Sequence, residues 1–338
     1  MATEKLNDIS WYSNEIALRR GEPGIQHSFM SSLATALNYI SGELDPTRLM
    51  GTSVFAFRIW INETICPSAM SIFNWSVVLP DAVQLAGYKV RYISRLWHES
   101  EAEAERREEA HQAIIKGLDD GFPAIVWDIA NAEWGLIIGY SNLMKSYQTL
   151  TNEGKLSKLP YNKLGKNGID ILSVTIPTIP NDKNDDEIIN NSLHRAVDHA
   201  EQKEWTERPQ YQDGLPGFDL WALIYDRWAM LVEAGKSDRI GSDIQSHAEY
   251  YAAHYYSARC YARDYLMGLS GGAPILQEAA SYYERVAVLL KPVWEYSRAT
   301  EQPEAARLGE LADNLREAKK AECRGIRLMK DYLRIHVN

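Results

Sequence analysis

Residues 121–150 read GFPAIVWDIANAEWGLIIGYSNLMKSYQTL, and this stretch decides the fold of the first half of the chain. It contains two short apolar runs, residues 124–129 and 136–140, which are rich in Val, Ile and Trp. The polar patch between the runs carries Asp128 and Glu133. Such runs predict two buried strands, with one carboxylate at the end of the first and another at the start of the second.

Further elements are predicted around this pair of strands. Residues 146–151 alternate and predict the next strand of a meander. A sheet this apolar needs helices on at least one face, because a bare hydrophobic sheet is not stable in water. Residues 27–41 supply one helix, with Ser28 as its cap and Gly42 as its stop. The remaining pattern predicts a β-rich segment at 51–62, strands at 88–95 and 170–176, a solvated helix at 100–120 and a loop at 152–168.

Composition limits the classes of function. The chain has 338 residues, 45% of them hydrophobic, which favours two domains. Its 36 Lys and Arg residues are outnumbered by 46 Asp and Glu residues, and this acidic balance argues against nucleic acid or an anionic membrane as the main partner. The N-terminus shows no signal-peptide pattern and no run approaches a membrane span, so we expect a cytoplasmic protein. The three cysteines are widely scattered, which is typical of reduced thiols.

A domain boundary is predicted at residues 177–186, PTIPNDKNDD, which hold two prolines and a charge cluster. We expect an α+β fold in two domains: residues 1–178 with a central antiparallel sheet, and residues 186–338 as an all-α helical bundle. Helices of the second domain are predicted at 187–205, 217–235, 242–267, 274–291 and 303–337. No fixed repeat length appears, so a bundle is favoured over a solenoid.

Arg58 is the single charge of the β-rich segment at residues 51–62. An unpaired buried charge is very costly, so this arginine requires a carboxylate partner or a ligand. We consider Asp128 and Glu133 as its counter-charges, which would make Arg58 structural. An arginine that points into an open cleft would instead favour an anionic ligand.

Cys66 is the best-placed thiol of the chain. Pro67 follows it, and proline suits the first position of a helix, so Cys66 is predicted close to a helix start, where the dipole and free amides favour a thiolate. The alternative is a small buried hydrophobic residue beside a turn, which is the role of most free cysteines.

One face of the predicted helix at 242–267 is rich in aromatic residues and histidine: His247, Tyr250, Tyr251, His254, Tyr255 and Ala258. Two histidines seven residues apart are separated by about 10 Å along a helix, which is too far for one metal ion, and we predict no metal site there. The face is interpreted as the bundle seam or as the wall of a cleft against the first domain. No phosphate-binding glycine motif occurs, and no cofactor is predicted.

Two blocks resemble a branch of the papain-like superfamily that includes peptidase family C39 and the BtrH-type acyltransferases of butirosin biosynthesis. SSLATALNYISG, residues 31–42, with Ser28 three residues before it, is similar to the first helix of that branch, which a cysteine opens. GFPAIVWDIANAEWGLIIGY, residues 121–140, is similar to its two central strands, in which a histidine stands six residues before the glycine of a Gly-Tyr pair. The resemblance covers roughly the first 175 residues and implies a papain-like N-terminal domain.

The second half is similar to the helical extension of a group of uncharacterised bacterial proteins that carry this N-terminal domain. The similarity is carried by GLPGFDLWALIYDRWA, by the tyrosine-rich helix and by LQEAASYYERVAVLLKPV.

The chain departs from the family at both reactive positions. Ser28 stands where the family has its cysteine, and Glu133 stands where it has its histidine. The family's third residue, an aspartate or asparagine, could only be Asn152. A serine hydroxyl needs a strong adjacent base, whereas a thiolate forms readily beside histidine, so we expect the cysteine mechanism to be absent.

Three hypotheses of function follow. The first is a non-catalytic pseudoenzyme that binds a small molecule or peptide in the cleft between the sheet and the helical domain. Its predicted ligand-binding residues are Ser28, Arg58, Trp60, Asp128, Glu133, Trp134, Tyr251 and His254. The second is an acyltransferase or amidohydrolase with Cys66 as nucleophile and Glu133 or His27 as proton carrier. The third is a scaffold that binds another protein through the bundle. The sequence does not determine an oligomeric state.

Overall fold

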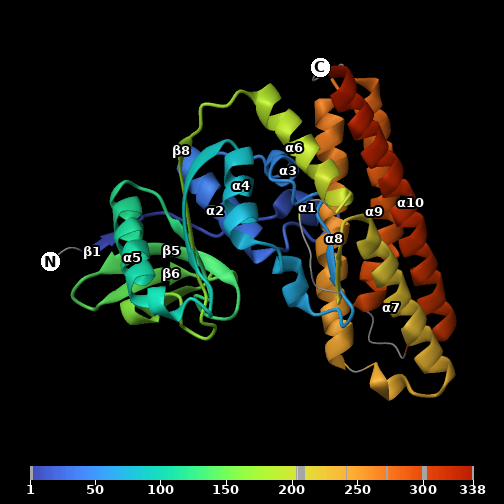
Figure 1. The fold of residues 1–338 in the computed structure, drawn as a ribbon, viewed down its shortest axis with the longest axis horizontal. Helices are drawn as coiled ribbons and strands as arrows, with labels where there is room; N and C mark the ends of the chain where they lie inside the picture. Colours follow the sequence, from blue (N-terminus) through green and yellow to red (C-terminus); the bar gives the residue numbers. More distant parts are fainter. Residues whose placement is uncertain are drawn as a thin grey trace. The chain divides into compact units, whose positions relative to one another are not determined.

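The computed structural model describes residues 3–202, 204, 210–240, 242–271, 273–298 and 303–336. The chain is an α+β protein that forms two compact units (Figure 1). Unit 1 comprises Met1–Asn14, His27–Leu49 and Trp75–Asn184, and unit 2 comprises Glu15–Gln26, Met50–Asn74 and Asp185–Asn338. Two segments of the first half therefore pack with the second half, although the sequence analysis placed all of residues 1–178 in one domain.

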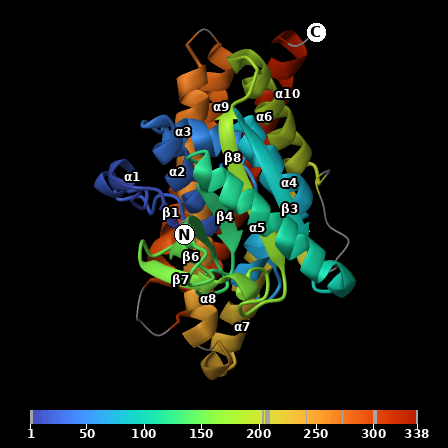
Figure 2. The same ribbon diagram turned by 90° about the vertical axis from the view of Figure 1, so that its left-hand side faces the viewer.

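An antiparallel sheet forms the centre of unit 1. Among the described residues it has seven strands, in the order β3-β8-β4-β5-β6-β7, with β1 added to β5 (Figure 2). The strands are β1 (Thr3–Lys5), β3 (Tyr88–Arg95), β4 (Ala124–Trp127), β5 (Trp134–Ser141), β6 (Ser146–Leu150), β7 (Leu156–Pro160) and β8 (Leu172–Pro180). The consecutive strands β4, β5 and β6 confirm the predicted meander.

Helices cover both faces of this sheet. Successive side chains of a strand point to opposite faces, so Ala124 and Val126 lie on one face of β4 and Trp127 on the other. On the first face they share a hydrophobic core with α5 (Glu103–Asp119). On the second face α2 (Ser28–Ser41) and α4 (Trp75–Leu85) contact the tryptophans of β4 and β5.

The ends of α2 follow from its capping residues. His27 is the N-cap, in extended conformation, and Ser28 is the first helical residue, so the prediction of Ser28 as the cap was wrong by one position. Gly42 ends the helix with a φ of +77°, where its amide donates to the carbonyl of Asn38. Glycine adopts this left-handed conformation without steric cost, and the predicted stop is confirmed.

The predicted loop at residues 152–168 is partly ordered structure. It contains β7 and the single turn η3 (Tyr161–Lys163). All five residues of β7 pair with β6, from Leu156 opposite Leu150 to Pro160 opposite Ser146. The glycines and lysines of this stretch concealed a strand, because β7 lies at the edge of the sheet, where polar residues face solvent.

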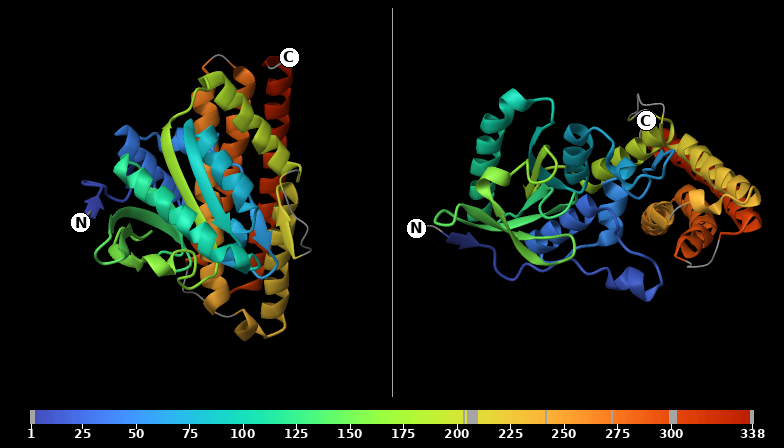
Figure 3. Two further views of the ribbon diagram at one scale, coloured as in Figure 1. Left: turned by 60° about the vertical axis from the view of Figure 1, so that its left-hand side comes forward. Right: turned by 90° about the horizontal axis from the view of Figure 1, so that it is seen from below.

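Long helices make up most of unit 2 (Figure 3). They are α6 (Asp185–Ala200), α7 (Leu215–Glu233), α8 (Ser242–Leu269), α9 (Pro274–Ser297) and α10 (Ala305–His336), with the short α1 (Glu15–Arg19) and the turn η4 (Ser237–Arg239). Helix α9 packs against both α8 and α10, and α10 also packs against α6 and α7. A two-stranded sheet of β2 (Trp60–Asn62) and β9 (Tyr211–Asp213) completes the unit. None of the helices in the described ranges combines the length and apolar character that a membrane span requires.

The predicted β-rich segment at residues 51–62 is mostly not a strand. Helix α3 (Pro46–Thr52) occupies its start, and only β2 at its end is extended. The carbonyl oxygens of Phe57 and Arg58 accept hydrogen bonds from the guanidinium of Arg259, at 3.1 and 2.9 Å, instead of from a neighbouring strand. Arg259 is fully buried and also forms an ion pair with Glu322 at 2.7 Å. Arg259, which is distant in sequence, thus supplies the hydrogen bonds to carbonyl groups that the local sequence pattern predicted to be paired in a sheet.

Two smaller differences concern the remaining helices. The predicted helix at 100–120 is divided into the turn η2 (Ser100–Ala102) and α5. After Cys66 comes a five-residue 3-10 helix, η1 (Pro67–Ser71), and α4 begins separately at Trp75.

Candidate functional site

Ser28 and Glu133 meet at one end of the unit 1 sheet. Ser28 begins α2, and Glu133 immediately precedes β5. The hydroxyl of Ser28 donates a hydrogen bond to Oε2 of Glu133, and the backbone N–H of Trp134 donates to Ser28 Oγ at 3.4 Å. Ser28 is 5% exposed and Glu133 is half-buried. The structure therefore brings together the two positions that the resemblance assigned to the nucleophile and the base.

The turn between β4 and β5 positions Glu133. Asp128 follows β4 with a φ of +57°, a left-handed conformation that aspartate tolerates better than most residues. Its N–H donates to the carbonyl of Glu133 at 2.9 Å and closes the turn. Its carboxylate accepts the backbone N–H groups of Gly168 and Ile169 at 2.6 and 2.7 Å. Asp128, predicted to bind a ligand, thus holds two chain segments in place beside the site.

Trp134 adjoins the Ser28–Glu133 pair, and two further tryptophans, Trp127 and Trp75, pack against Trp134. The rings of Trp127 and Trp134 are 4.4 Å apart between centroids, because these residues are paired across β4 and β5. Trp75 lies 5.0 Å from Trp127 and 4.7 Å from Trp134. In the described part of the chain, the buried indole N–H groups of Trp127 and Trp134 have no acceptor. Trp134 was predicted from the sequence to bind a ligand, whereas Trp127 and Trp75 were not; the position of residues 127 and 134 on either side of the six-residue connection between the two strands was the available signal.

His27 does not replace the missing imidazole. Its ring packs against that of Trp134, with centroids 5.7 Å apart, while Phe29 meets the same indole edge-on at 5.9 Å. The hydrogen-bond partner of Ser28 Oγ is the carboxylate of Glu133. A carboxylate is a weaker base than the imidazole that commonly activates a serine, so this pair is less suited to generating a nucleophile near neutral pH than a serine–histidine pair. The arrangement is suited to holding N–H donors of a ligand.

Arg58 lies in unit 2, and its partner is a carboxylate that the sequence analysis did not select. Its Nε and Nη2 donate to Glu204 at 2.9 and 2.6 Å, and its Nη1 donates to the carbonyl of Ser53 at 2.7 Å. The predicted pairing with Asp128 and Glu133 was therefore wrong, because the guanidinium is fully engaged by Glu204 and Ser53.

Glu204 is held as a carboxylate by its two basic neighbours. Burial alone would raise its pKa, but the charge and hydrogen bonds of Arg58, together with His199, lower the pKa well below the usual value. Nδ1 of His199 lies 2.9 Å from Glu204, and its Nε2 accepts the N–H of Ile59 at 2.8 Å. Arg58, Glu204 and His199 form a buried structural network.

Trp60, Tyr251 and His254, all predicted to bind a ligand, are buried in unit 2. The hydroxyl of Tyr251 donates to the carbonyl of Cys66, and the hydroxyl of Tyr255 donates to the carbonyl of Trp60 at 2.6 Å. These tyrosine tips attach the segment around β2 to α8. A ligand could reach them only by displacing core side chains, so the structure assigns them to packing.

Cys66 is partly exposed, and its Sγ lies 3.0 Å from the hydroxyl of Ser68. The helix that follows it is a short 3-10 helix, whose dipole is much weaker than that of an α-helix of several turns. Cys260 is buried, and burial raises its pKa to about 12. Among the described residues, no three His, Cys, Asp or Glu side chains are placed to hold a metal ion.

No protein-family model matches the chain, and no curated protein resembles it closely enough to count as a relative.

Proposed function

We propose that unit 1 is a papain-like domain that has lost its cysteine chemistry and binds a small molecule or peptide at the Ser28–Glu133 pair. The hydrogen bond between these two residues carries the proposal, because they are far apart in sequence and stand where the family has its cysteine and histidine. A serine beside a carboxylate supports recognition rather than acyl transfer.

The charge of the pair indicates the ligand chemistry. Glu133 replaces a group that carries positive charge during catalysis with one that carries negative charge. Its half-buried carboxylate accepts the hydrogen bond of the Ser28 hydroxyl, and the backbone N–H of Trp134, whose ring packs on Trp127, donates to the same hydroxyl. A carboxylate accepts N–H donors, and aromatic faces attract cations, so an amine or amide group of the ligand is favoured over an acid.

Restoring the two reactive residues tests the papain-like geometry. In the variant Ser28→Cys/Glu133→His, a thiol stands at the start of the 14-residue helix α2 beside an imidazole, and both features lower a thiol pKa. Weighing the larger thiolate fraction against its reduced nucleophilicity, we expect iodoacetamide to label position 28 roughly three- to tenfold faster at pH 6 than in Ser28→Cys alone. Labelling is measured by mass spectrometry of the peptide that contains residue 28. Equal rates in the two variants would contradict the proposal.

Ligand screening tests the binding role. A metabolite library of amines and amides is screened by thermal shift against the intact chain, and each hit is then checked for chemical change by mass spectrometry. We expect hits that raise the melting temperature and are recovered unaltered, and Glu133→Gln should lose the shift. Glu153→Gln is the matched control, because Glu153 is an exposed carboxylate of the same unit. Conversion of a hit into product, or an equal shift in both variants, would overturn the assignment.

The acyl-transfer alternative at Cys66 receives less support. The hydrogen-bond partner of its thiol is a hydroxyl, which does not promote thiolate formation as a histidine or a helix dipole would.

A further inference from the structure

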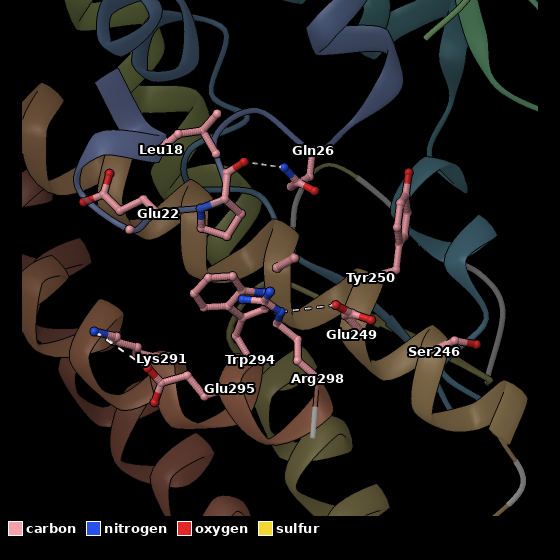
Figure 4. Close-up of a pocket in the computed structure, with 13 residues that line it drawn as sticks. Leu18, Glu22, Gln26, Ser246, Glu249, Tyr250, Lys291, Trp294, Glu295 and Arg298 are labelled. Atoms are coloured by element: carbon pink, nitrogen blue, oxygen red, sulfur yellow. Dashed lines mark hydrogen bonds and ion pairs between the residues drawn. The ribbon is translucent and has the colours of Figure 1, made fainter. Parts of the chain in front are cut away.

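A cavity of about 710 Å³ lies within unit 2, between the segment Glu15–Gln26 and the helices α8 and α9 (Figure 4). Its size is that of sites for small organic molecules. Leu18 and Pro23 contribute apolar surface from the segment, and Trp294 contributes an aromatic surface from α9. This cavity plays no part in the function proposed for Ser28 and Glu133.

Trp294 organises the lining of the cavity. Its indole stacks on the buried ring of Tyr256, with centroids 5.3 Å apart and planes inclined by 28°. The guanidinium carbon of Arg298 lies 4.9 Å from the centroid of the Trp294 ring. Stacking on an aromatic face restricts the guanidinium, so the donors of Arg298 are already oriented for a carboxylate.

Two loose ion pairs border this aromatic surface. Nε of Arg298 lies 3.6 Å from Glu249 on α8, and Nζ of Lys291 lies 3.8 Å from Glu295 on α9. Both separations exceed a normal hydrogen bond, and all four side chains are about half exposed, so each pair adds little to stability. A ligand can therefore exchange with either partner at small cost.

The third carboxylate of the lining is different. Glu22 is buried, and its two oxygens are taken by Arg20 at 2.8 Å and Arg263 at 3.1 Å. It anchors the segment Glu15–Gln26 and is not free to exchange. The exchangeable charges of the cavity are thus two cations and two anions.

We propose that this cavity binds a short zwitterionic peptide of about three residues. A simple anion would meet Glu249 and Glu295, and a simple cation would meet Lys291 and Arg298, whereas a ligand with opposite charges at its two ends satisfies both pairs. The carboxylate end pairs with Arg298, and the amine end pairs with Glu295, which lies beside Lys291. Lys291 on α9 and Arg298 at its C-cap mark the two ion pairs and are seven residues apart, which corresponds to about 10 Å along the helix. About three residues of extended chain span that distance, at 3.3–3.6 Å per residue. The central side chain then packs on Trp294.

Isothermal titration calorimetry of the intact chain tests the proposal, with alanyl-leucyl-alanine as the probe. We expect saturable binding of the free tripeptide and at least tenfold weaker binding of its N-acetylated and C-amidated forms. Arg298→Gln, which removes the partner of the peptide carboxylate, and Glu295→Gln, which removes the partner of the amine, should each weaken binding at least tenfold. Arg307→Gln is the matched control, because Arg307 is an exposed arginine on α10 that pairs with Glu310.

Three results would overturn the proposal: no binding at millimolar peptide, equal binding of the free and capped forms, or undiminished binding by Arg298→Gln. A further variant separates the two proposed sites. Glu133→Gln should leave the affinity for the tripeptide unchanged. If Glu133→Gln abolishes binding while Arg298→Gln does not, the peptide occupies the Ser28–Glu133 site and the assignment to the cavity is wrong.

Discussion

Replacing Arg58 with methionine removes the cation of a buried ion pair, and we expect it to destabilise unit 2 strongly. Arg58 is 1% exposed and Glu204 is 9% exposed, and the guanidinium also donates to the carbonyl of Ser53. Methionine keeps most of the aliphatic stem. It leaves the carboxylate of Glu204 with the hydrogen bond to His199 and removes the donor to the carbonyl of Ser53.

The size of the effect follows from this geometry. Removing one partner of a buried ion pair costs about 3–5 kcal/mol, because the other charge stays buried without compensation. In a unit of this size about 2–4 °C is lost per kcal/mol, so the melting temperature of unit 2 should fall by roughly 6–20 °C. The double variant Arg58→Met/Glu204→Met removes both charges and should lose less than the sum of the two single variants.

The pH dependence of the free energy of unfolding gives a second measure of the Arg58–Glu204 ion pair. Glu204 has a lowered pKa in the folded protein, so its pair stabilises the fold fully above the unfolded pKa of about 4.3, and this stability is lost as the pH falls towards the folded value. The difference between the wild type and Arg58→Met should therefore narrow below about pH 4.

Urea denaturation followed by circular dichroism, at pH 7 and pH 3.5, measures both effects. Arg316→Met is the control: Arg316 is an exposed arginine of the same unit, and its loss should cost within about 0.5 kcal/mol. A loss of less than about 1 kcal/mol in Arg58→Met at pH 7, or additive single variants, would refute the reasoning.

Three further predictions concern packing, the turn of unit 1 and a buried thiol. A Cβ at Gly51 would lie 2.1–2.5 Å from ring atoms of Tyr265, so Gly51→Ala should cost about 2 kcal/mol or more in denaturation experiments, and Tyr265→Ala should reduce that penalty in the double variant. Asp128→Asn retains the left-handed backbone but weakens two charged hydrogen bonds, and it should lower the free energy of unfolding by about 1–3 kcal/mol; an unchanged urea midpoint would exclude the structural role. The pKa of Cys260 is raised to about 12, against about 8.5 in the unfolded chain, so the stabilising contribution of its neutral thiol is complete below pH 8.5 and declines above it. Between pH 8 and pH 10 the free energy of unfolding of the wild type should therefore fall by about 2 kcal/mol more than that of Cys260→Ala, as measured by chemical denaturation.

Local patterns predicted the elements that local forces determine. The alternation of residues 146–151 and the stop at Gly42 each reappear in the structure, because side-chain periodicity and glycine conformation act over a few residues. The proximity of Ser28 and Glu133 was predicted on a different basis. It came from a resemblance to a family in which a helix start and a strand start converge, and no periodicity of this chain would have shown it.

Long-range pairing explains what the sequence could not predict. Nothing near Arg58 indicates that its partner is Glu204, since two carboxylates of the first half were equally plausible by residue type. The stretch before Trp60 has the composition of a strand, yet Arg259 satisfies its carbonyl groups from two hundred positions further along the chain. The partners of these groups depend on which residues, distant in sequence, the tertiary structure brings within hydrogen-bonding distance.

The burial of Arg259 among the carbonyls of Phe57 and Arg58 has a consequence for biosynthesis. This contact, with its counter-ion Glu322, cannot form until the ribosome has added more than two hundred and fifty further residues after position 58. At 5–20 residues per second, that delay is about 13–50 s. During this interval the hydrophobic stretch from Met50 to Asn74 has been translated while the helices that bury it are still incomplete. The nascent chain therefore presents a defined target for ribosome-associated chaperones, and early termination would leave that target permanently uncovered.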